Sequence, residues 1–181
     1  YGKEQSFNSP ISESAMFKYT TALNHLLSSP SNRIRIADTT VVFWAETSKK
    51  SCEKSCEELV KFFFDPPEPE KKEEKNVEGS RVQDITTVKE IEEILNKVRI
   101  GKKVNQEDIG ADPETNFYIL GLSPNNARLA VRFWYVASIG SLIEKVARHH
   151  LDMEVIRDDY GPRYVSVCRL LNETVPQSSD K

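Results

Sequence analysis

The chain has 181 residues, of which 38% are hydrophobic, and its 25 basic and 28 acidic side chains give a net charge of −3. A chain of this length buries about 70% of the surface that its unfolded form exposes, so it can fold as one domain without disulfide bonds. It contains no run of 18 apolar residues and no basic, apolar and small-residue signal pattern, which argues against a membrane span and against export. We therefore expect a cytoplasmic protein. Because it begins with Tyr1, we expect a fragment of a longer chain.

The first third of the chain predicts a helix, a pair of strands and a second helix. An apolar stripe with helical spacing ends before Pro30 and predicts a helix over 12–28. Alternating isoleucine and arginine residues, followed by a β-branched and aromatic run, predict a strand hairpin over 33–44. The next apolar positions fit an amphipathic helix over 47–64, with both cysteines of this segment on its apolar side.

The centre of the chain is acidic and rich in proline. Residues 65–115 carry 14 acidic and 9 basic side chains, so the negative charge of the chain is concentrated there. The stretch from Asp65 to Glu78 has three prolines, nine charged side chains and one aliphatic side chain. Such a stretch cannot bury enough apolar surface to offset the entropy of ordering it. We predict a mobile insertion over 65–80 within one domain that is formed by 1–64 and 81–181.

The second half of the chain predicts helices on either side of another strand hairpin. A capped apolar stripe predicts a helix over 86–100, and a polar loop follows it. Two β-rich runs around a Pro-Asn turn predict a hairpin over 117–137. A helix over 141–151 and a last one opened by Pro162 complete the chain. The whole pattern predicts an α+β fold, with a small, mostly antiparallel sheet and helices packed on it.

The last predicted strand carries the most informative pattern. Its alternation assigns one set of side chains to solvent and the other to the core. The solvent set is Arg128, Ala130, Arg132, Trp134 and Val136, and the core set is Leu129, Val131, Phe133 and Tyr135. Guanidinium groups pair with phosphate oxygens and an indole offers a base a stacking plane, so the solvent set is typical of a surface for single-stranded nucleic acid.

The arginines of the first hairpin form a second basic strip, and two lysines that follow that hairpin can extend it. If the strands share one sheet, four arginines can line one surface. The predicted nucleic-acid-binding residues are Arg33, Arg35, Lys49, Lys50, Arg128, Arg132 and Trp134. The alternative is structural, because exposed strand arginines are usually solvated or paired with carboxylates, and the indole can be covered by a helix.

Motifs for catalysis are missing from the sequence. The glycines are never closer than nine positions apart, which excludes G-x-G-x-x-G turns, P-loops and nucleophile elbows, and there is no C-x-x-C or H-E-x-x-H. Two sets of residues could form metal sites, but simpler structural roles fit both better. They are a magnesium site at Glu154, Asp158 and Asp159, and a zinc site at Cys52, Cys56 and Cys168 with His149 or His150. We predict no catalytic residue, metal or cofactor.

Four strings, in order along the chain, resemble the large subunit of the type I-C CRISPR surveillance complex (Cascade). They are 1–8 (YGKEQSFN), 17–27 (FKYTTALNHLL), 38–45 (DTTVVFWA) and 117–134 (FYILGLSPNNARLAVRFW). The residues over 65–115 resemble nothing specific. In this family the full chain extends on both sides, so the resemblance implies a middle piece.

The resemblance implies a non-catalytic subunit in antiviral defence, which helps an RNA-guided complex to recognise double-stranded target DNA and to hold the displaced strand. The implied partners are target DNA, the guide RNA, the other Cascade subunits and a helicase-nuclease that is recruited afterwards. Our hypothesis is that the seven predicted residues contact this DNA. The alternative is a scaffold that docks other subunits or the end of the guide RNA, and a metal-dependent nuclease ranks third.

Overall fold

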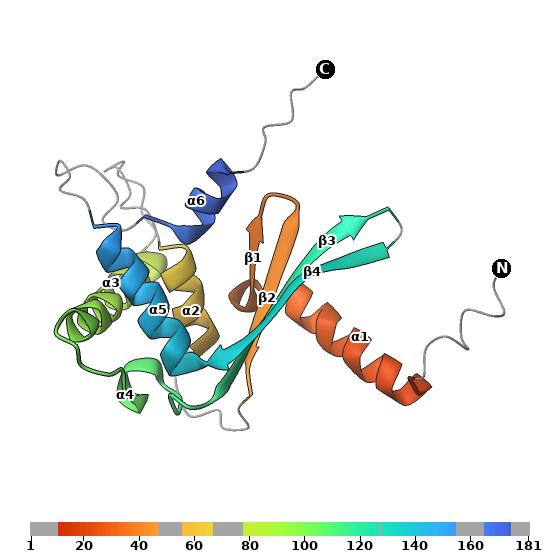
Figure 1. Ribbon diagram of the computed structural model, residues 1–181, viewed down its shortest axis with the longest axis horizontal. Coiled ribbons are helices and arrows are strands. Elements are labelled where there is room, and N and C mark those ends of the chain that lie inside the picture. Colours follow the sequence, from red (N-terminus) through yellow and green to blue (C-terminus); the bar gives the residue numbers. More distant parts are fainter. Residues whose placement is uncertain (1–10, 47–55, 67–77, 127, 155–164, 175–181) are drawn as a thin grey trace, which may run out of the picture.

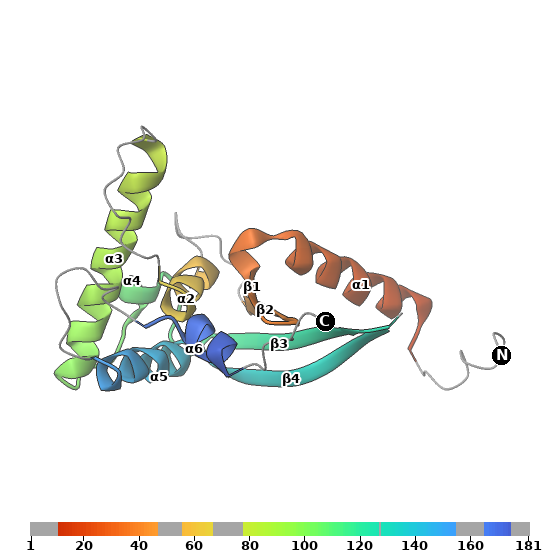
Figure 2. The same cartoon turned by 90° about the horizontal axis from the view of Figure 1, so that it is seen from above.

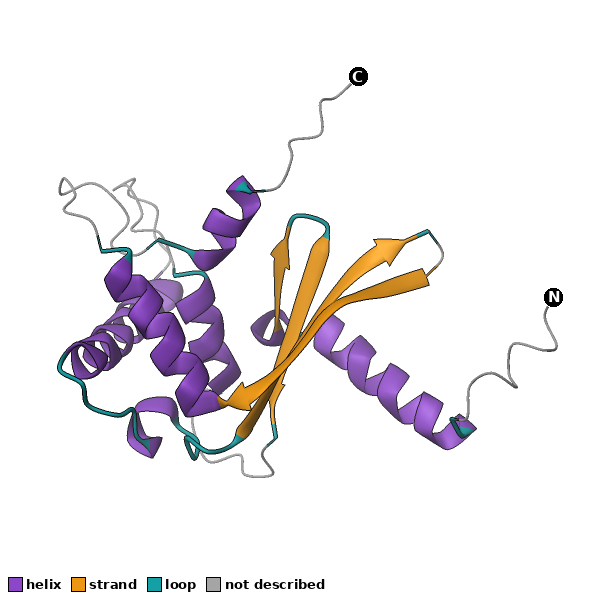
Figure 3. Cartoon of the chain, in the orientation of Figure 1, coloured by secondary structure: helices purple, strands orange, loops and turns teal. Residues whose placement is uncertain are grey.

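The computed structural model describes residues 11–46, 56–66, 78–126, 128–154 and 165–174. In these ranges it forms an antiparallel sheet with the strand order β1-β2-β3-β4, together with helices, so the predicted α+β class is confirmed (Figure 3). The strands are β1 (Arg33–Ile36), β2 (Thr39–Ala45), β3 (Asn116–Asn125) and β4 (Arg128–Ser138). The helices are α1 (Glu13–Ser28), η2 (Pro30–Asn32, a 3-10 turn), α2 (Cys56–Phe64), α3 (Glu78–Arg99), α4 (Gln106–Ile109), α5 (Ile139–Asp152) and α6 (Val167–Glu173).

Both predicted hairpins are present, and they join through β2 and β3. β1 pairs with β2 and β3 pairs with β4 along the chain, while the long-range pairing of β2 with β3 sets Phe43 opposite Ile119. Cross-strand partners project from the same face of a sheet. The odd-numbered apolar residues of β2 and β3 therefore form one continuous face.

The hydrophobic core lies between that face and the helices α2, α3 and α5. Phe43 and Phe117 are fully buried, and their rings stack with centroids 6.1 Å apart. From the helices, Phe63, Ile91 and Ile143 belong to the same cluster. These helices lie together beside one end of the sheet, so the other end of the β3–β4 hairpin extends beyond them (Figure 1).

Helix α1 lies on the other side of the sheet (Figure 2). Its start is capped as predicted, because the Ser12 side chain accepts a hydrogen bond from the Ala15 backbone at 3.2 Å. It has no buried residue, and Phe17 is 70% exposed. The predicted helix over 12–28 is thus confirmed. Only its last turns approach the sheet, where Arg33 of β1 donates to the Leu27 carbonyl oxygen.

Two helices differ from the prediction. α3 starts at Glu78 rather than at residue 86, and no proline interrupts the sequence from there to Arg99. α4 falls in the predicted polar loop, where a capping box between Asn105 and Asp108 and the buried side chain of Ile109 hold one short helix. α4 ends at Gly110, whose φ of 73° favours glycine.

Some predictions concern residues outside the described ranges. Of the helix predicted over 47–64, the described part is α2. The segment 67–77, which makes up most of the predicted insertion, is not described, so the insertion and the domain boundaries stay predictions. The predicted start of the last helix at Pro162 also lies outside, and α6 is capped by Ser166 instead. None of the described helices combines the length and the apolar composition that crossing a bilayer requires.

The buried His150 couples the fold to pH. Its Nε2–H donates to the Phe63 carbonyl oxygen at 2.7 Å, and burial lowers its pKa below the ordinary 6.5. As the pH falls below about 6.5, the unfolded chain takes up a proton that the folded chain does not, so the free energy of unfolding decreases. His150→Gln keeps an N–H donor but has no imidazole to protonate. We therefore expect the free energy of unfolding of this variant to decrease less than that of the wild type as the pH falls. Denaturant unfolding between about pH 8 and pH 5 measures it, and equal pH slopes in both proteins would refute the coupling.

Candidate nucleic-acid interface

The β3–β4 hairpin carries three of the predicted site residues and projects away from α2, α3 and α5 (Figure 1). Asn125 pairs with Arg128, and Asn126 has a φ of 55°, which an asparagine tolerates in a tight turn. The strands therefore end two residues later than the predicted Pro-Asn turn at Ser123–Asn126 would place them. Pro124 belongs to β3 and pairs with Leu129.

A β-bulge breaks the alternation that the sequence predicts for β4. Leu122 pairs with Val131 whereas Gly121 pairs with Phe133, so Arg132 is an extra residue in β4. A Cβ on Gly121 would come within 2.4 Å of the Phe133 ring. The absence of a side chain at Gly121 thus lets that ring pack directly on β3.

The bulge sorts the β4 side chains into two groups that differ from the predicted ones. Through their β3 partners, Arg128 and Ala130 share the core-side face of the sheet with Phe133 and Tyr135, and Arg132 contacts Ser123 on that side. The opposite face carries Leu129, Val131, Trp134 and Val136. The prediction that Trp134 shares a face with Arg128 and Arg132 is therefore wrong.

The predicted burial of the apolar set on β4 is also wrong. Leu129 is 57% exposed, Val131 64%, Phe133 43% and Tyr135 40%. β4 is the last strand of the sheet and reaches beyond the helices, so nothing described covers most of these side chains. An alternating pattern predicts which residues share a face only where the strand has no bulge, and it does not show whether another layer exists above that face.

The two arginines of β4 remain accessible. Arg128 is exposed beside the turn. Arg132 donates from Nε to the Ser123 hydroxyl at 2.6 Å, and its Nη2 lies 3.8 Å from Asp38 Oδ2 in the β1–β2 turn. Arg132 and Asp38 are both exposed, and such ion pairs contribute about 0–1 kcal/mol. A phosphate can therefore replace Asp38 as the partner of this guanidinium at little cost.

The arginines of β1 lie elsewhere. Arg33 is exposed and donates to the Leu27 carbonyl oxygen, and Arg35 donates from Nε to the Ala37 carbonyl oxygen at 3.1 Å. β1 and β4 are the two edges of the sheet, three strand spacings or about 14 Å apart. Arg33 also faces the side opposite to Arg128, so the four arginines do not line one surface. Lys49 and Lys50 lie outside the described residues.

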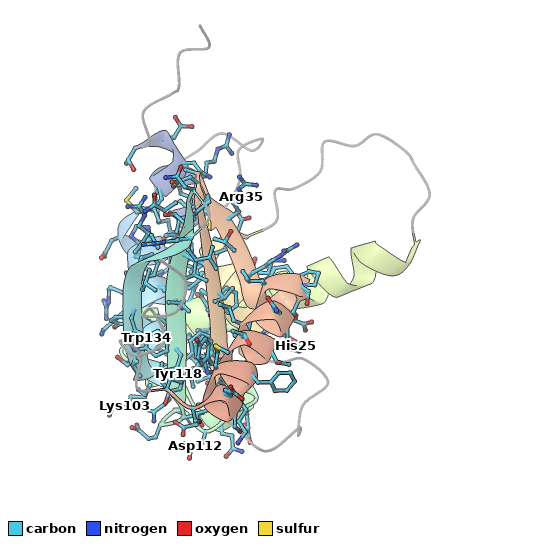
Figure 4. The ribbon with its side chains drawn as sticks, turned by 90° about the vertical axis from the view of Figure 1, so that its right-hand side faces the viewer. His25, Arg35, Lys103, Asp112, Tyr118 and Trp134 are labelled. Atoms are coloured by element: carbon cyan, nitrogen blue, oxygen red, sulfur yellow. The ribbon has the colours of Figure 1, made fainter. Side chains whose placement is uncertain are left out.

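Trp134 belongs to an aromatic cluster, and the sequence pattern did not reveal this cluster. The ring centroids of Trp44 and Tyr118 are 5.3 Å apart, and that of Trp134 lies 5.6 Å from Trp44 and 5.8 Å from Tyr118. Figure 4 shows Tyr118 next to Trp134. Three strands contribute one ring each. Only the pairing of β2 with β3 could have revealed this cluster, and that pairing joins residues more than 70 positions apart.

Glu46 anchors one end of the aromatic cluster. Its Oε2 accepts hydrogen bonds from Asn116 Nδ2 at 3.0 Å and from the Tyr118 hydroxyl at 2.8 Å. These two bonds favour the carboxylate and lower the pKa of Glu46, and the bond to Glu46 raises the pKa of Tyr118. The Tyr118 ring is thereby held in place for stacking, and it is half-buried beside the exposed Trp134.

The candidate metal ligands are not brought together in the described part of the chain, which has no group of three His, Cys, Asp or Glu residues that could hold an ion. Burial raises the pKa of Cys56 to about 12 and that of Cys168 to about 11, so both stay thiols. Glu154 accepts from Arg99 at 2.5 Å. Cys52, Asp158 and Asp159 lie outside the described residues.

Comparisons with known proteins bear on the resemblance of the four strings. A search of curated proteins finds no match to the chain. The model of the family described as CRISPR-associated protein (Cas_Csd1) matches residues 1–181, which is the whole sequence given. The chain therefore belongs to the Csd1 family of CRISPR-associated proteins, the family of the type I-C large subunit.

Proposed function

We propose that this chain is a non-catalytic part of an RNA-guided CRISPR effector complex and contributes to binding target double-stranded DNA and the displaced strand. The observation that carries the proposal is the projecting β3–β4 hairpin with two accessible arginines, in a chain of the Csd1 family. Guide RNA and other subunits are then its neighbours in the complex, and a separate helicase-nuclease cleaves the DNA.

The physical demands on such a subunit match this hairpin. Because guide pairing reads the target sequence, the protein needs chiefly phosphate contacts and stacking planes for unpaired bases. Arg128 and Arg132 supply phosphate contacts on one face of β4, and Trp134 supplies a stacking plane on the opposite face. The bulge thus makes two separate contact surfaces, one for the phosphate backbone and one for a base.

Replacing Trp134 by leucine tests the stacking surface. Leucine keeps an apolar side chain but offers a base no aromatic plane, so we expect Trp134→Leu to weaken binding of single-stranded DNA by the intact complex about fivefold, the low end for one stacked base. The indole already contacts Trp44 and Tyr118, which limits the effect. The salt dependence should not change, because no charge is removed. Fluorescence titration with a labelled oligonucleotide measures both, and an unchanged affinity would argue against stacking at Trp134.

A docking role is a second candidate, and the exposed apolar side chains favour it. Met16, Phe17 and Tyr19 on α1 are also each at least half exposed. A row of exposed apolar side chains, such as that on one face of β4, commonly marks a protein contact. This docking role uses the exposed apolar side chains, whereas phosphate binding uses Arg128 and Arg132. Co-purification of the other subunits therefore tests docking, and DNA titration tests the arginines.

A further inference from the structure

The two edges of the sheet differ sharply in how they are protected. β1 has four residues, carries two arginines and contacts α6, whose Asn172 side chain accepts from the Ala37 backbone at 2.8 Å. β4 also carries two arginines and has a bulge at Arg132, but it is 11 residues long and contains no proline and no acidic residue. Among the described residues no strand pairs with its outer side. Soluble proteins usually shorten, charge or cover such an edge, since its free N–H and C=O groups invite another strand.

The side chains of β4 need a cover on the face opposite the core. The bulge gathers Leu129, Val131, Trp134 and Val136 there, and all four are exposed. A helix lying on this face would cover these side chains and leave the outer backbone groups of β4 without partners. A strand beside β4 satisfies both requirements, because it supplies backbone hydrogen bonds and places every second side chain next to that row.

The charges around β4 indicate the composition of that strand. On the core-side face Arg128 and Arg132 are cationic, and Lys145 places its Nζ 3.2 Å from the Tyr135 hydroxyl. No carboxylate comes from β4 itself, and the carboxylate near Arg132 is that of the exposed Asp38 in the β1–β2 turn, at 3.8 Å. A second copy of β4 would bring the same arginines and no acidic side chain, so self-pairing lacks a complement. A nucleic acid could neutralise the arginines, but its phosphates would not cover the apolar row and could not donate hydrogen bonds to the outward C=O groups of β4.

We propose that an extended segment of another protein in the complex pairs with the outer edge of β4 as a fifth strand. Its side chains are apolar on the face next to Leu129, Val131 and Trp134, and acidic on the face next to Arg128 and Arg132. This inference deepens the docking role and rests on the outer edge and the apolar row of β4. Acidic side chains of the strand and DNA phosphates would compete for Arg128 and Arg132, so the tests below are made without DNA and at Val131, and their outcome does not depend on DNA binding.

Hydrogen–deuterium exchange of the full-length protein, alone and in the assembled complex without DNA, tests this pairing. We expect the outward amides of β4 to exchange at least about tenfold more slowly in the complex, since each gains a hydrogen bond, while β3 changes little. Equal rates for the β4 amides in both samples would overturn the proposal. So would protection that appears only after target DNA is added, or protection in the free protein that rises with its concentration, which would indicate a nucleic acid or a second copy as the occupant.

A pair of substitutions at one exposed position gives a second test. Val131→Lys introduces a charge into the apolar row, whereas Val131→Thr keeps the shape and the strand propensity. We expect Val131→Lys to weaken complex assembly at least about tenfold and Val131→Thr to change it by less than about twofold. Thermal unfolding of both variants should match the wild type, because the side chain is largely exposed. Normal assembly by a folded Val131→Lys protein would overturn the proposal, whatever the DNA affinity of the complex.

Discussion

The double substitution Arg128→Gln/Arg132→Gln is expected to weaken the binding of target DNA by the intact complex about 60-fold at about 0.1 M salt. Each guanidinium that contacts a phosphate releases close to one counterion, so the slope of log affinity against log salt should flatten by about two units. Glutamine keeps hydrogen-bonding capacity and removes the charge. Titrations of a target duplex over a salt series measure the affinity and the slope together.

The control for this experiment is Arg148→Gln on α5, an exposed arginine in the helical layer away from the hairpin. Arg148→Gln should leave the DNA affinity and the salt slope near the wild-type values. Because Arg132 also donates to Ser123, the unfolding of the double variant must be checked against that of Arg128→Gln alone. A wild-type salt slope in a folded double variant would show that these arginines do not contact phosphates.

Phe43→Ala is expected to lower the free energy of unfolding by about 3–5 kcal/mol. Phe43 is fully buried at the centre of the sheet and stacks on Phe117, so alanine leaves a cavity that the surrounding strands and helices cannot close. Denaturant unfolding followed by circular dichroism measures the loss.

The same substitution at Phe17 is the matched control. That side chain is 70% exposed on α1, and its removal should change the stability by less than about 0.5 kcal/mol. If Phe43→Ala cost no more than Phe17→Ala, the β2–β3 face would not be the hydrophobic centre of the domain.

Local patterns were sufficient to predict most of the elements. Ser12 and the apolar stripe behind it determined α1, and alternation with turn residues determined both hairpins, because these signals act between residues that are close in sequence. The same signals assigned Arg128 and Arg132 to an outer face; both side chains are accessible, but they lie on the core side of the sheet, where β4 reaches beyond the helices of the core. The family resemblance of the four strings is confirmed over the whole sequence given.

The remaining features depend on contacts between distant parts of the chain. The bulge at Arg132 arises where Phe133 packs on Gly121 of the neighbouring strand, and strict alternation cannot anticipate the inserted residue. The same alternation describes a central strand and an edge strand, so it could not show that Val131 lies exposed. The stacking of Trp44 on Tyr118 likewise requires the register of β2 against β3.

The central claim is that the tip of the β3–β4 hairpin contacts the DNA backbone, and the structure of the assembled complex bound to target DNA measures this directly. We predict phosphate oxygens within hydrogen-bonding distance of the guanidinium groups of Arg128 and Arg132, with the Asp38 contact of Arg132 lost or shared. A complex in which DNA is fully engaged elsewhere, while both guanidinium groups lie in solvent or against another subunit, would contradict the claim.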